Sequence, residues 1–314
     1  MKILLTGGAG FIGSAISHKL ISQGNKLTII DNLSTGSRSN IPDNAVFIEG
    51  DVSNPNTIKK LNNKYFDAIL HISGQSSGEI SFENPVNDLN SNTISTLMLL
   101  NYSRTIGCKR FIYASTMSVY GEQKGKEKFC ENDITNPKSF YAVGKLASEN
   151  YLKIFNHEYG IKYTSLRYFN VYGVGQNLEN LKQGMVSIYL KQFLDDNYKV
   201  VQIKGSLDRF RDFSHIDDVV DVTIESISNK DFFNNTFNVG SGVKTSVKKL
   251  VKSIQDILNS NKKIIVSKGT IGDQFGIYAD NKKLKNIYKK NFISFEKGLQ
   301  KTVSEINELF KKNI

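Results

Sequence analysis

The feature that most constrains the fold is a glycine-rich turn that directly follows an apolar run at the start of the chain. Residues 2–6, KILLT, have the character of a buried strand, and GGAGFIGSAI follows without a break. Gly7, Gly10 and Gly13 satisfy the pattern G-x-x-G-x-x-G. In such a turn the glycines allow a tight bend, a close approach to a pyrophosphate and tight packing of a helix on the strand. We therefore expect a phosphate-binding turn and a helix that begins near Phe11.

Short apolar runs alternate with helical patterns through the first half of the chain, which is typical of a parallel sheet with crossover helices. The order predicts the α/β class, with a Rossmann-type doubly wound parallel sheet. The expected strands are 2–6, 26–30, 45–50, 68–73, 110–115 and 163–169, and the expected helices are 11–23, 54–63, 84–106 and 138–159.

The regular alternation loosens after about residue 170, where GVGQNLENLKQG has the composition of a long polar loop. Loops of this length in compact domains are usually binding segments or disordered ones. We expect an NAD-binding Rossmann domain at 1–170, with later crossings from about 205–240. The rest, 171–314, is expected to form mainly a smaller C-terminal substrate-binding lobe.

The charge of the chain raises the question of nucleic-acid binding. The 314 residues carry a formal net charge of +11. The lysines are spread along the chain, however, and their denser stretch at 244–290 contains no arginine, so we expect a solvated face and no nucleic-acid partner. A positive field would favour an anionic small substrate. No apolar stretch approaches membrane-spanning length, so no membrane partner is expected.

Cysteine usage bears on the compartment and on metal binding. Cys108 and Cys130 are the two cysteines of the chain. They provide neither a disulfide framework nor a metal-ligand cluster, which fits a reducing compartment. We expect a cytoplasmic protein without a metal site.

An acidic residue stands at the end of the second expected strand. Asp31 is placed to accept hydrogen bonds from the ribose diol of a dinucleotide bound at the glycine turn. Its charge should repel a 2'-phosphate, which favours NAD, whereas Arg38 keeps NADP open. Asp51 follows the third expected strand, and its position suits either a helix cap or an adenine contact.

The stretch SFYAVGKLAS places Tyr141 and Lys145 four residues apart. Helical periodicity continues to about residue 156, so the two side chains should share one face of a helix. The same spacing occurs in Tyr120–Lys124 and Tyr278–Lys282. The first of these lies in a charged, loop-like run and the second outside the nucleotide-binding half. Context therefore selects Tyr141.

A tyrosine and a lysine at this spacing can move a proton. A free tyrosine needs roughly 4 kcal/mol of stabilisation of its phenolate to act as a base near pH 7. One ammonium at about 4 Å in a partly shielded site supplies on the order of 4 kcal/mol. We therefore expect Lys145 to make Tyr141 a phenolate base beside a bound dinucleotide. Ser115 and Thr116 end the fifth expected strand, and either hydroxyl could bridge tyrosine and substrate, although such residues at strand ends are most often turns or caps.

Taken in order, GGAGFIG, Asp31, STMSVYG and Tyr141-x-x-x-Lys145 resemble the extended short-chain dehydrogenase/reductase family. Within it, the chain is similar to the NAD-dependent nucleotide-sugar epimerases and dehydratases over nearly its whole length. The resemblance implies catalytic roles for Thr116, Tyr141 and Lys145, with Ser115 next to the nicotinamide. The cofactor-binding positions that it implies are Gly7, Gly10, Phe11, Ile12, Gly13, Asp31, Asn32, Asp51, Val52, Gln75, Asn92, Ser115, Tyr141 and Lys145.

Two further stretches, RYFNVYG and FRDFSHIDDV, match family segments on the substrate side. They imply that Asn170 contacts the sugar nucleotide and that Arg211 binds its diphosphate. The family commonly has a second arginine before a Gly-Asp pair, but this chain reads GTIGD, with Thr270 at that point. Arg209 is the expected substitute. The implied substrate-binding set is Thr116, Tyr141, Asn170, Arg209, Arg211 and Asp273.

The reaction that the resemblance implies is the epimerisation of a nucleotide sugar, expected to be a UDP-hexose at C4, through a 4-keto intermediate. Related dehydratases carry an acidic pair directly after the threonine, where this chain has Met117 and Ser118. A nucleotide-sugar 4-keto reductase, dehydratase or decarboxylase is the first alternative, and a non-catalytic NAD-binding regulator is the second. A homodimer, formed through the helices around 84–106 and Tyr141, is implied by the resemblance alone.

Overall fold

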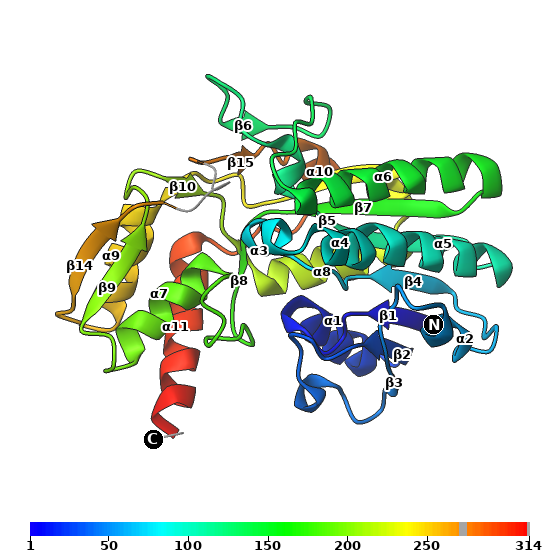
Figure 1. Cartoon of the computed structure of the whole chain (residues 1–314), viewed down its shortest axis with the longest axis horizontal. Coiled ribbons are helices and arrows are strands. Elements are labelled where there is room, and N and C mark those ends of the chain that lie inside the picture. The colour runs from blue at the N-terminus through cyan, green and yellow to red at the C-terminus, as the bar shows by residue number, and fades with distance from the viewer. Residues whose placement is uncertain (270–274, 313–314) are drawn as a thin grey trace.

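A seven-stranded parallel sheet is the centre of the fold (Figure 1). The computed structural model describes residues 1–269 and 275–312. The strand order is β12-β7-β5-β4-β1-β2-β3. β2 and β3 lie on one side of β1, and the later strands lie on its other side, as in doubly wound sheets. The strands are β1 (Lys2–Thr6), β2 (Lys26–Asp31), β3 (Val46–Glu49), β4 (Ala68–His71), β5 (Arg110–Thr116), β7 (Lys162–Tyr168) and β12 (Asn235–Val239).

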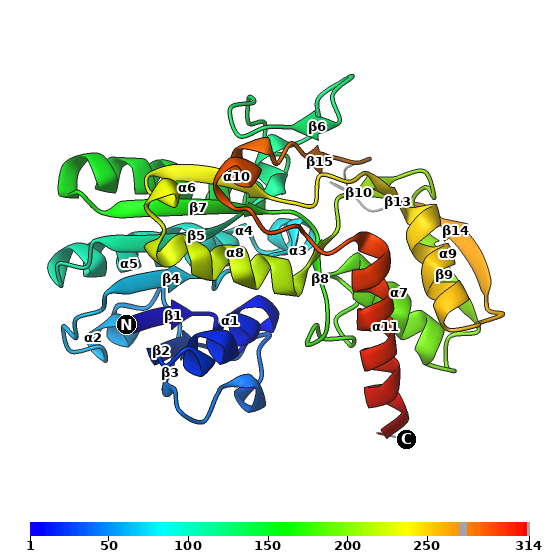
Figure 2. The same cartoon turned by 180° about the vertical axis from the view of Figure 1, so that it is seen from behind.

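Both faces of the sheet are buried, which explains why its strands are continuous apolar runs rather than alternating ones. Ile3 and Leu5 pack into the core cluster on one face, and Leu4 between them packs into the cluster on the other. Helices α1 (Phe11–Ser22) and α8 (Ile216–Ser228) cover the first face (Figure 2). The opposite face is covered by α2 (Pro55–Lys59), α5 (Ser95–Thr105) and α6 (Phe140–Tyr159).

The predicted α/β class and doubly wound parallel sheet are confirmed. All six predicted strands are present, with ends that differ from the prediction by no more than two residues. The seventh strand, β12, was not among them because NTFNV is rich in polar residues. The Asn238 side chain of this strand is nevertheless buried, and its amide is hydrogen-bonded within the protein. The amide nitrogen donates to the carbonyl oxygens of Phe129 and Asp280, and the amide oxygen accepts from the hydroxyl of Tyr120.

The predicted helix at 84–106 is interrupted in the structure. It consists of α4 (Pro85–Leu89), a π-helical segment η2 (Asn90–Ile94) and then α5. A separate helix, α3 (Gly78–Glu83), precedes it. Single π-turns often occur at functional sites, and this one contains Asn92, one of the predicted cofactor residues.

A second group of elements lies beside the carboxyl end of the sheet and has its own hydrophobic core (Figure 1). The limits predicted for the two domains, 1–170 and 171–314, stay a prediction. The group is formed by α7 (Met185–Leu194), β9 (Val200–Lys204), α9 (Val247–Ile257), β14 (Lys263–Ser267) and α11 (Phe295–Lys312).

Short elements complete the described fold. They pair as β11 with β8, β10 with β13 and β15 with β6, and α10 follows β15. Their bounds are β6 (Lys128–Phe129), β8 (Val171–Tyr172), β10 (Phe210–Arg211), β11 (Ser214–His215), β13 (Thr245–Ser246), β15 (Tyr278–Ala279), α10 (Lys282–Ile287) and the short 3-10 turns η1 (Arg38–Asn40), η3 (Met117–Tyr120) and η4 (Lys230–Phe232). Within the described ranges, no helix has the length and apolar character needed to cross a bilayer.

Candidate active site

A cleft of ≈ 880 Å³ lies between the carboxyl edge of the sheet and the second group of elements. Ligands of doubly wound folds bind at this edge of the sheet. Of the predicted site residues, those that line the cleft are Phe11, Ile12, Ser115, Thr116, Tyr141, Lys145, Asn170, Arg209 and Arg211.

The glycine turn adopts the conformation that its sequence predicts. Gly7 has φ +76°, which other residues rarely adopt, and a Cβ on Gly13 would overlap the carbonyl oxygen of Gly7. Helix α1 begins directly afterwards with Gly10 as its N-cap residue. The N-terminus of α1 therefore meets the cleft at Phe11, with an arrangement suited to a pyrophosphate.

Asp31 lies at the end of β2 and its carboxylate is held against the glycine turn. It accepts hydrogen bonds from the backbone N–H groups of Ala9 (3.0 Å) and Leu33 (2.8 Å). These bonds use part of the carboxylate's acceptor capacity and leave room for a ribose diol. Arg38 is the residue that leaves NADP as an alternative cofactor. It lies 3.6 Å from Glu49 in an exposed ion pair.

The neighbouring predicted cofactor residues do not line the cleft but lie at the same edge of the sheet. Asn32 donates to Asp51 (3.1 Å), and Asp51 accepts from the backbone and hydroxyl of Ser53. Asn54, not Asp51, caps α2. Val52 is buried in the core cluster.

Gln75 and Asn92 meet at a buried carboxylate that the sequence did not single out. Both amide nitrogens donate to Asp88 Oδ1, at 2.9 and 3.1 Å. Asn92 Oδ1 is buried and has no hydrogen-bond partner among the described residues. A buried acceptor left unpaired costs about 1–3 kcal/mol, so a donor from a bound molecule would remove that cost. This atom, together with the glycine turn and Asp31, fits a bound dinucleotide.

Tyr141 and Lys145 share the inner face of α6, as predicted. Ser139 caps this helix by accepting from the N–H of Ala142. The Lys145 ammonium donates to the carbonyl oxygen of Ala114 (2.9 Å) and lies 5.9 Å from the centre of the Tyr141 ring. Thr116 ends β5, and its hydroxyl accepts from the N–H of Ser118. The three predicted catalytic residues are therefore brought together at one end of the cleft.

Their electrostatics differ from the prediction. Burial raises the pKa of Tyr141 to about 12, against a smaller lowering by the Thr116 hydroxyl. Burial also lowers the pKa of Lys145 to about 8, and Asp88 acts in the opposite direction. In the protein alone, Lys145 therefore does not bring the pKa of Tyr141 toward neutrality, because desolvation of the phenolate is the larger effect.

Ser115 lines the cleft, and its hydroxyl is hydrogen-bonded within the protein. It donates to Glu149 Oε1 (2.6 Å), and Glu149 forms a buried, bidentate ion pair with Arg167 of β7. These contacts tie α6 to β5 and β7 two turns beyond Tyr141. They fix the position of the helix that carries the tyrosine and the lysine.

On the substrate side, two guanidinium groups lie close together. Arg209 and Arg211 are 7% and 6% exposed. Burial, together with the neighbouring charge of Arg209, lowers the pKa of Arg211 to about 10. Two buried like charges are a natural site for a dianion. Asn170 also lines the cleft, and its amide donates to the carbonyl oxygen of Asp212 (3.1 Å).

Comparison with known proteins identifies the family. Residues 3–240 match the profile of the NAD dependent epimerase/dehydratase family. The chain belongs to this family. A putative UDP-glucose 4-epimerase of Methanocaldococcus jannaschii is 34% identical over 303 residues, covering 96% of this chain and 97% of that protein.

Solved structures of the family agree with this assignment. The UDP-glucose 4-epimerase of Thermotoga maritima, solved with UDP-glucose, superposes with a TM-score of 0.94 at 34% identity and covers 98% of this chain and 99% of that one. The UDP-glucose 4-epimerase of Thermus thermophilus, solved with NAD, has a TM-score of 0.91 at 28% identity, with 100% of both chains covered. The cofactor of the family is NAD.

The prediction and the described residues differ at several positions. Asp273 and Thr270 lie outside the described residues. The sequence did not point to Asp88 or Glu149, although each had a signal: Asp88 stands four residues before Asn92, and Glu149 stands four after Lys145. Residues of α7 and β9, such as Tyr189 and Gln202, also line the cleft and were not predicted because only the tertiary fold brings them there.

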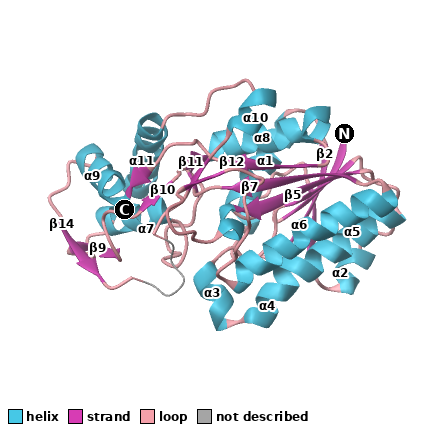
Figure 3. Cartoon of the chain, turned by 90° about the horizontal axis from the view of Figure 1, so that it is seen from above, coloured by secondary structure: helices cyan, strands magenta, loops and turns pink. Residues whose placement is uncertain are grey.

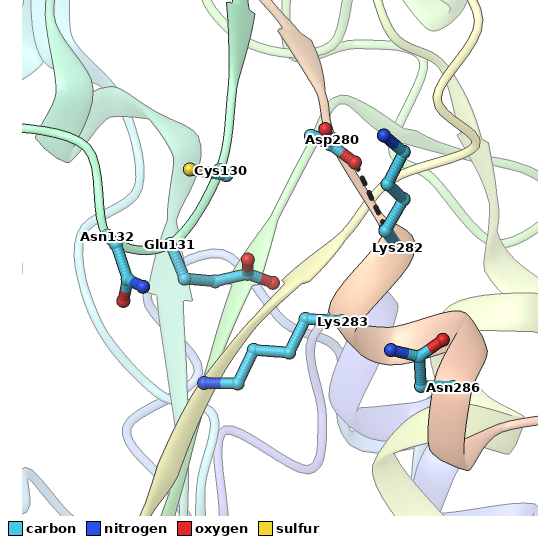
Figure 4. Close-up of a pocket in the computed structure, with 7 residues that line it drawn as sticks. All are labelled: Cys130, Glu131, Asn132, Asp280, Lys282, Lys283 and Asn286. Carbon is cyan, nitrogen blue, oxygen red and sulfur yellow. Dashed lines mark hydrogen bonds between the residues drawn. The ribbon is translucent and has the colours of Figure 1, made fainter.

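A second, smaller hollow of ≈ 360 Å³ shares no lining residue with the cleft. Figure 4 shows it between the chain after β6 and the start of α10, with Glu131 and Lys283 facing each other across it. Both side chains have partners: Glu131 accepts from the N–H of Asn238, and Lys283 donates to the carbonyl oxygen of Thr236. The cleft, and not this hollow, is the candidate active site.

Proposed function

We propose that the chain interconverts UDP-hexoses at C4, using NAD and passing through a 4-keto sugar. The observation that carries this proposal is the cleft itself, whose lining includes Thr116, Tyr141 and Lys145 together with Arg211. The similarity to the Methanocaldococcus and Thermotoga proteins supports a UDP-hexose as the substrate.

Each residue has a defined task in this reaction. Tyr141 takes the proton of the C4 hydroxyl and later returns it, with Thr116 sharing the hydrogen bond. Lys145 stabilises the ionised tyrosine and contacts the nicotinamide ribose. A bound NAD would supply the hydride chemistry, with the hydride taken from C4 and given back to the opposite face of the sugar, so the cycle would have no net redox change.

The nucleotide end of the substrate is assigned to the arginines. Arg211 binds the diphosphate, and Arg209 supplies the second cation that the family usually places near Thr270. Their proximity supports this substitution, since a dianion would relieve the repulsion between them. Asn170 holds the sugar nucleotide between these groups and Tyr141.

Other reactions of the family fit the cleft less well. A dehydratase needs an acid and a base of its own for elimination, whereas the cleft is lined at this point by Met117 and Ser118. A 4-keto reductase would consume reduced cofactor, and a decarboxylase would need a UDP-uronic acid as substrate and would release CO₂. A non-catalytic regulator would not need the complete set of Thr116, Tyr141 and Lys145.

We also propose a cytoplasmic homodimer. Large apolar side chains are exposed on the outer faces of α3, α4 and α6, which lie side by side (Figure 3). A second copy of the chain would cover this apolar face. The apolar face consists of Phe82, Val86, Leu89, Phe140, Val143 and Ile154.

One assay tests the function. Purified protein is incubated with UDP-glucose, UDP-galactose and their N-acetylated forms without added NAD, and the sugars are followed by NMR. Interconversion at C4 with no net formation of NADH is expected. Stoichiometric consumption of added NADH would favour the reductase, and release of CO₂ from a UDP-uronic acid would favour the decarboxylase.

A further inference from the structure

Asp88 occupies a central position that the proposed mechanism does not use. It lies on α4, is 1% exposed, and stands between the amides of Gln75 and Asn92 and the helix that carries Tyr141 and Lys145. Its Oδ1 accepts from both amides. Its Oδ2 faces α6, 3.5 Å from the point where a Cβ on Gly144 would lie. One oxygen of the carboxylate therefore binds the two amides, and the other lies beside α6.

The first consequence concerns the amide of Asn92. Its nitrogen donates to the carbonyl oxygen of Gln75 (3.0 Å) and to Asp88 Oδ1 (3.1 Å), so both of its hydrogens are used. Because both partners are acceptors, the amide cannot be flipped. Its oxygen must then point the other way, toward Gly74 and the Lys145 ammonium, where it is buried without a partner. Asp88 thus fixes a buried acceptor on the side of Lys145, where a hydrogen-bond donor of a bound cofactor could pair with it.

The second consequence concerns the charge of Lys145. The groups that face this ammonium are His71 of β4, Tyr113 of β5, Tyr141 of α6 and Asp88 of α4. Burial keeps the pKa of His71 well below its usual value, so this histidine is neutral. Burial raises the pKa of both tyrosines, so they too are neutral near pH 7. Asp88 is then the negative group, among the described residues, that favours the charged form of Lys145.

We propose that Asp88 is a positioning residue that orients the Gln75 and Asn92 amides toward the cofactor and keeps Lys145 protonated beside Tyr141. The inference rests on the proposed function for the role of Lys145, but its effect on cofactor binding is independent of the reaction catalysed. Asp88 itself need not touch cofactor or substrate.

The test compares Asp88→Asn with Asn92→Ala and with Asp43→Asn, which removes an exposed carboxylate outside the cleft lining. Binding of NAD to protein freed of nucleotide is measured by calorimetry. We expect Asp88→Asn and Asn92→Ala each to weaken NAD binding about tenfold, the effect of one lost hydrogen bond, and Asp43→Asn to leave it unchanged.

The pH profile of kcat/KM separates the two roles. Loss of the Asp88 charge should move the alkaline limb to lower pH by about one unit, since Lys145 then loses its proton more easily. Asn92→Ala should keep the wild-type limb. Wild-type NAD affinity together with a wild-type alkaline limb in Asp88→Asn would overturn the proposal.

If Asp88→Asn does not fold, Asp88→Glu provides the test. The displaced carboxylate should weaken NAD binding but keep the alkaline limb of the pH profile, and unchanged NAD affinity in Asp88→Glu would count against the proposal. Wild-type protein without epimerase activity would contradict the proposed function, whereas the NAD measurements would still test Asp88.

Discussion

Burial controls the ionisation of the two titratable groups on the inner face of α6. It raises the pKa of Tyr141 to about 12 and lowers that of Lys145 to about 8, because each charged form loses its hydration. Ionising Tyr141 therefore costs on the order of 3 kcal/mol more than in water. Near pH 7 the phenol holds its proton and is ready to donate it, while its action as a base needs further positive charge in the cleft.

The role of Tyr141 gives a prediction at the scale of one oxygen atom. Tyr141→Phe should retain NAD but lose turnover by about 10²–10⁴-fold, the usual contribution of a general acid–base group. The measurements are the NAD content of the purified variant and the rate of sugar interconversion followed by NMR. Tyr151→Phe, which alters an exposed tyrosine of the same helix, is the control. Near-normal turnover in Tyr141→Phe would remove this residue from the mechanism.

What the sequence predicts about single residues depends on the distance over which they act. Tyr141 and Lys145 lie one helical turn apart, so helical periodicity and the surrounding sequence select them. The pattern at the end of the fifth strand leaves both Ser115 and Thr116 open, and the family resemblance is needed to choose Thr116. Asp88 contacts α6 through the tertiary fold, and no local pattern reports such a contact. The same holds for the pKa of Tyr141, since spacing gives the distance to a charge but not the loss of solvent.

At the scale of elements, the apolar strands could be predicted closely because both faces of the sheet are buried. Strand β12 escaped prediction because its polar side chains find partners only across the fold, as Asn238 does. The π-helical segment η2 was not predicted either, since 84–106 has a helical pattern throughout and a single π-turn is itself helical. It is this segment that carries Asn92 into the site.

The attachment of α6 to the sheet leads to a prediction about stability. Glu149 accepts from Ser115 of β5 and forms a buried ion pair with Arg167 of β7 at 2.6 Å. Glu149→Gln leaves the guanidinium buried without its counter-charge, which should destabilise the fold by about 3–5 kcal/mol. Chemical denaturation measures this. Glu158→Gln, at the exposed end of the same helix, should cost less than about 1 kcal/mol, and equal losses in the two variants would contradict the anchoring role.

At the scale of the whole molecule, the cleft joins two parts with separate cores. The sheet supplies the glycine turn and the Tyr141 helix, and the elements around α7 and β9 supply the opposite wall. In the proposed reaction, the sugar would lie between the cofactor side and the arginines. The exposed apolar face of α3, α4 and α6 lies outside the cleft lining, where the proposed homodimer would cover it.

The homodimer proposal predicts how charge on that face alters assembly. Val143 is 51% exposed on α6, within the apolar face. Val143→Asp would place a carboxylate twice in a two-fold interface, where it would be desolvated and repelled by its copy, so the variant should be monomeric at concentrations where the wild type is dimeric. Sedimentation velocity measures the mass of both. Val266→Asp on β14, a residue with 54% exposure outside the face, should keep the wild-type mass. A wild type that sediments as a monomer, or a Val143→Asp variant with the wild-type dimer mass, would show that another surface, or none, mediates assembly.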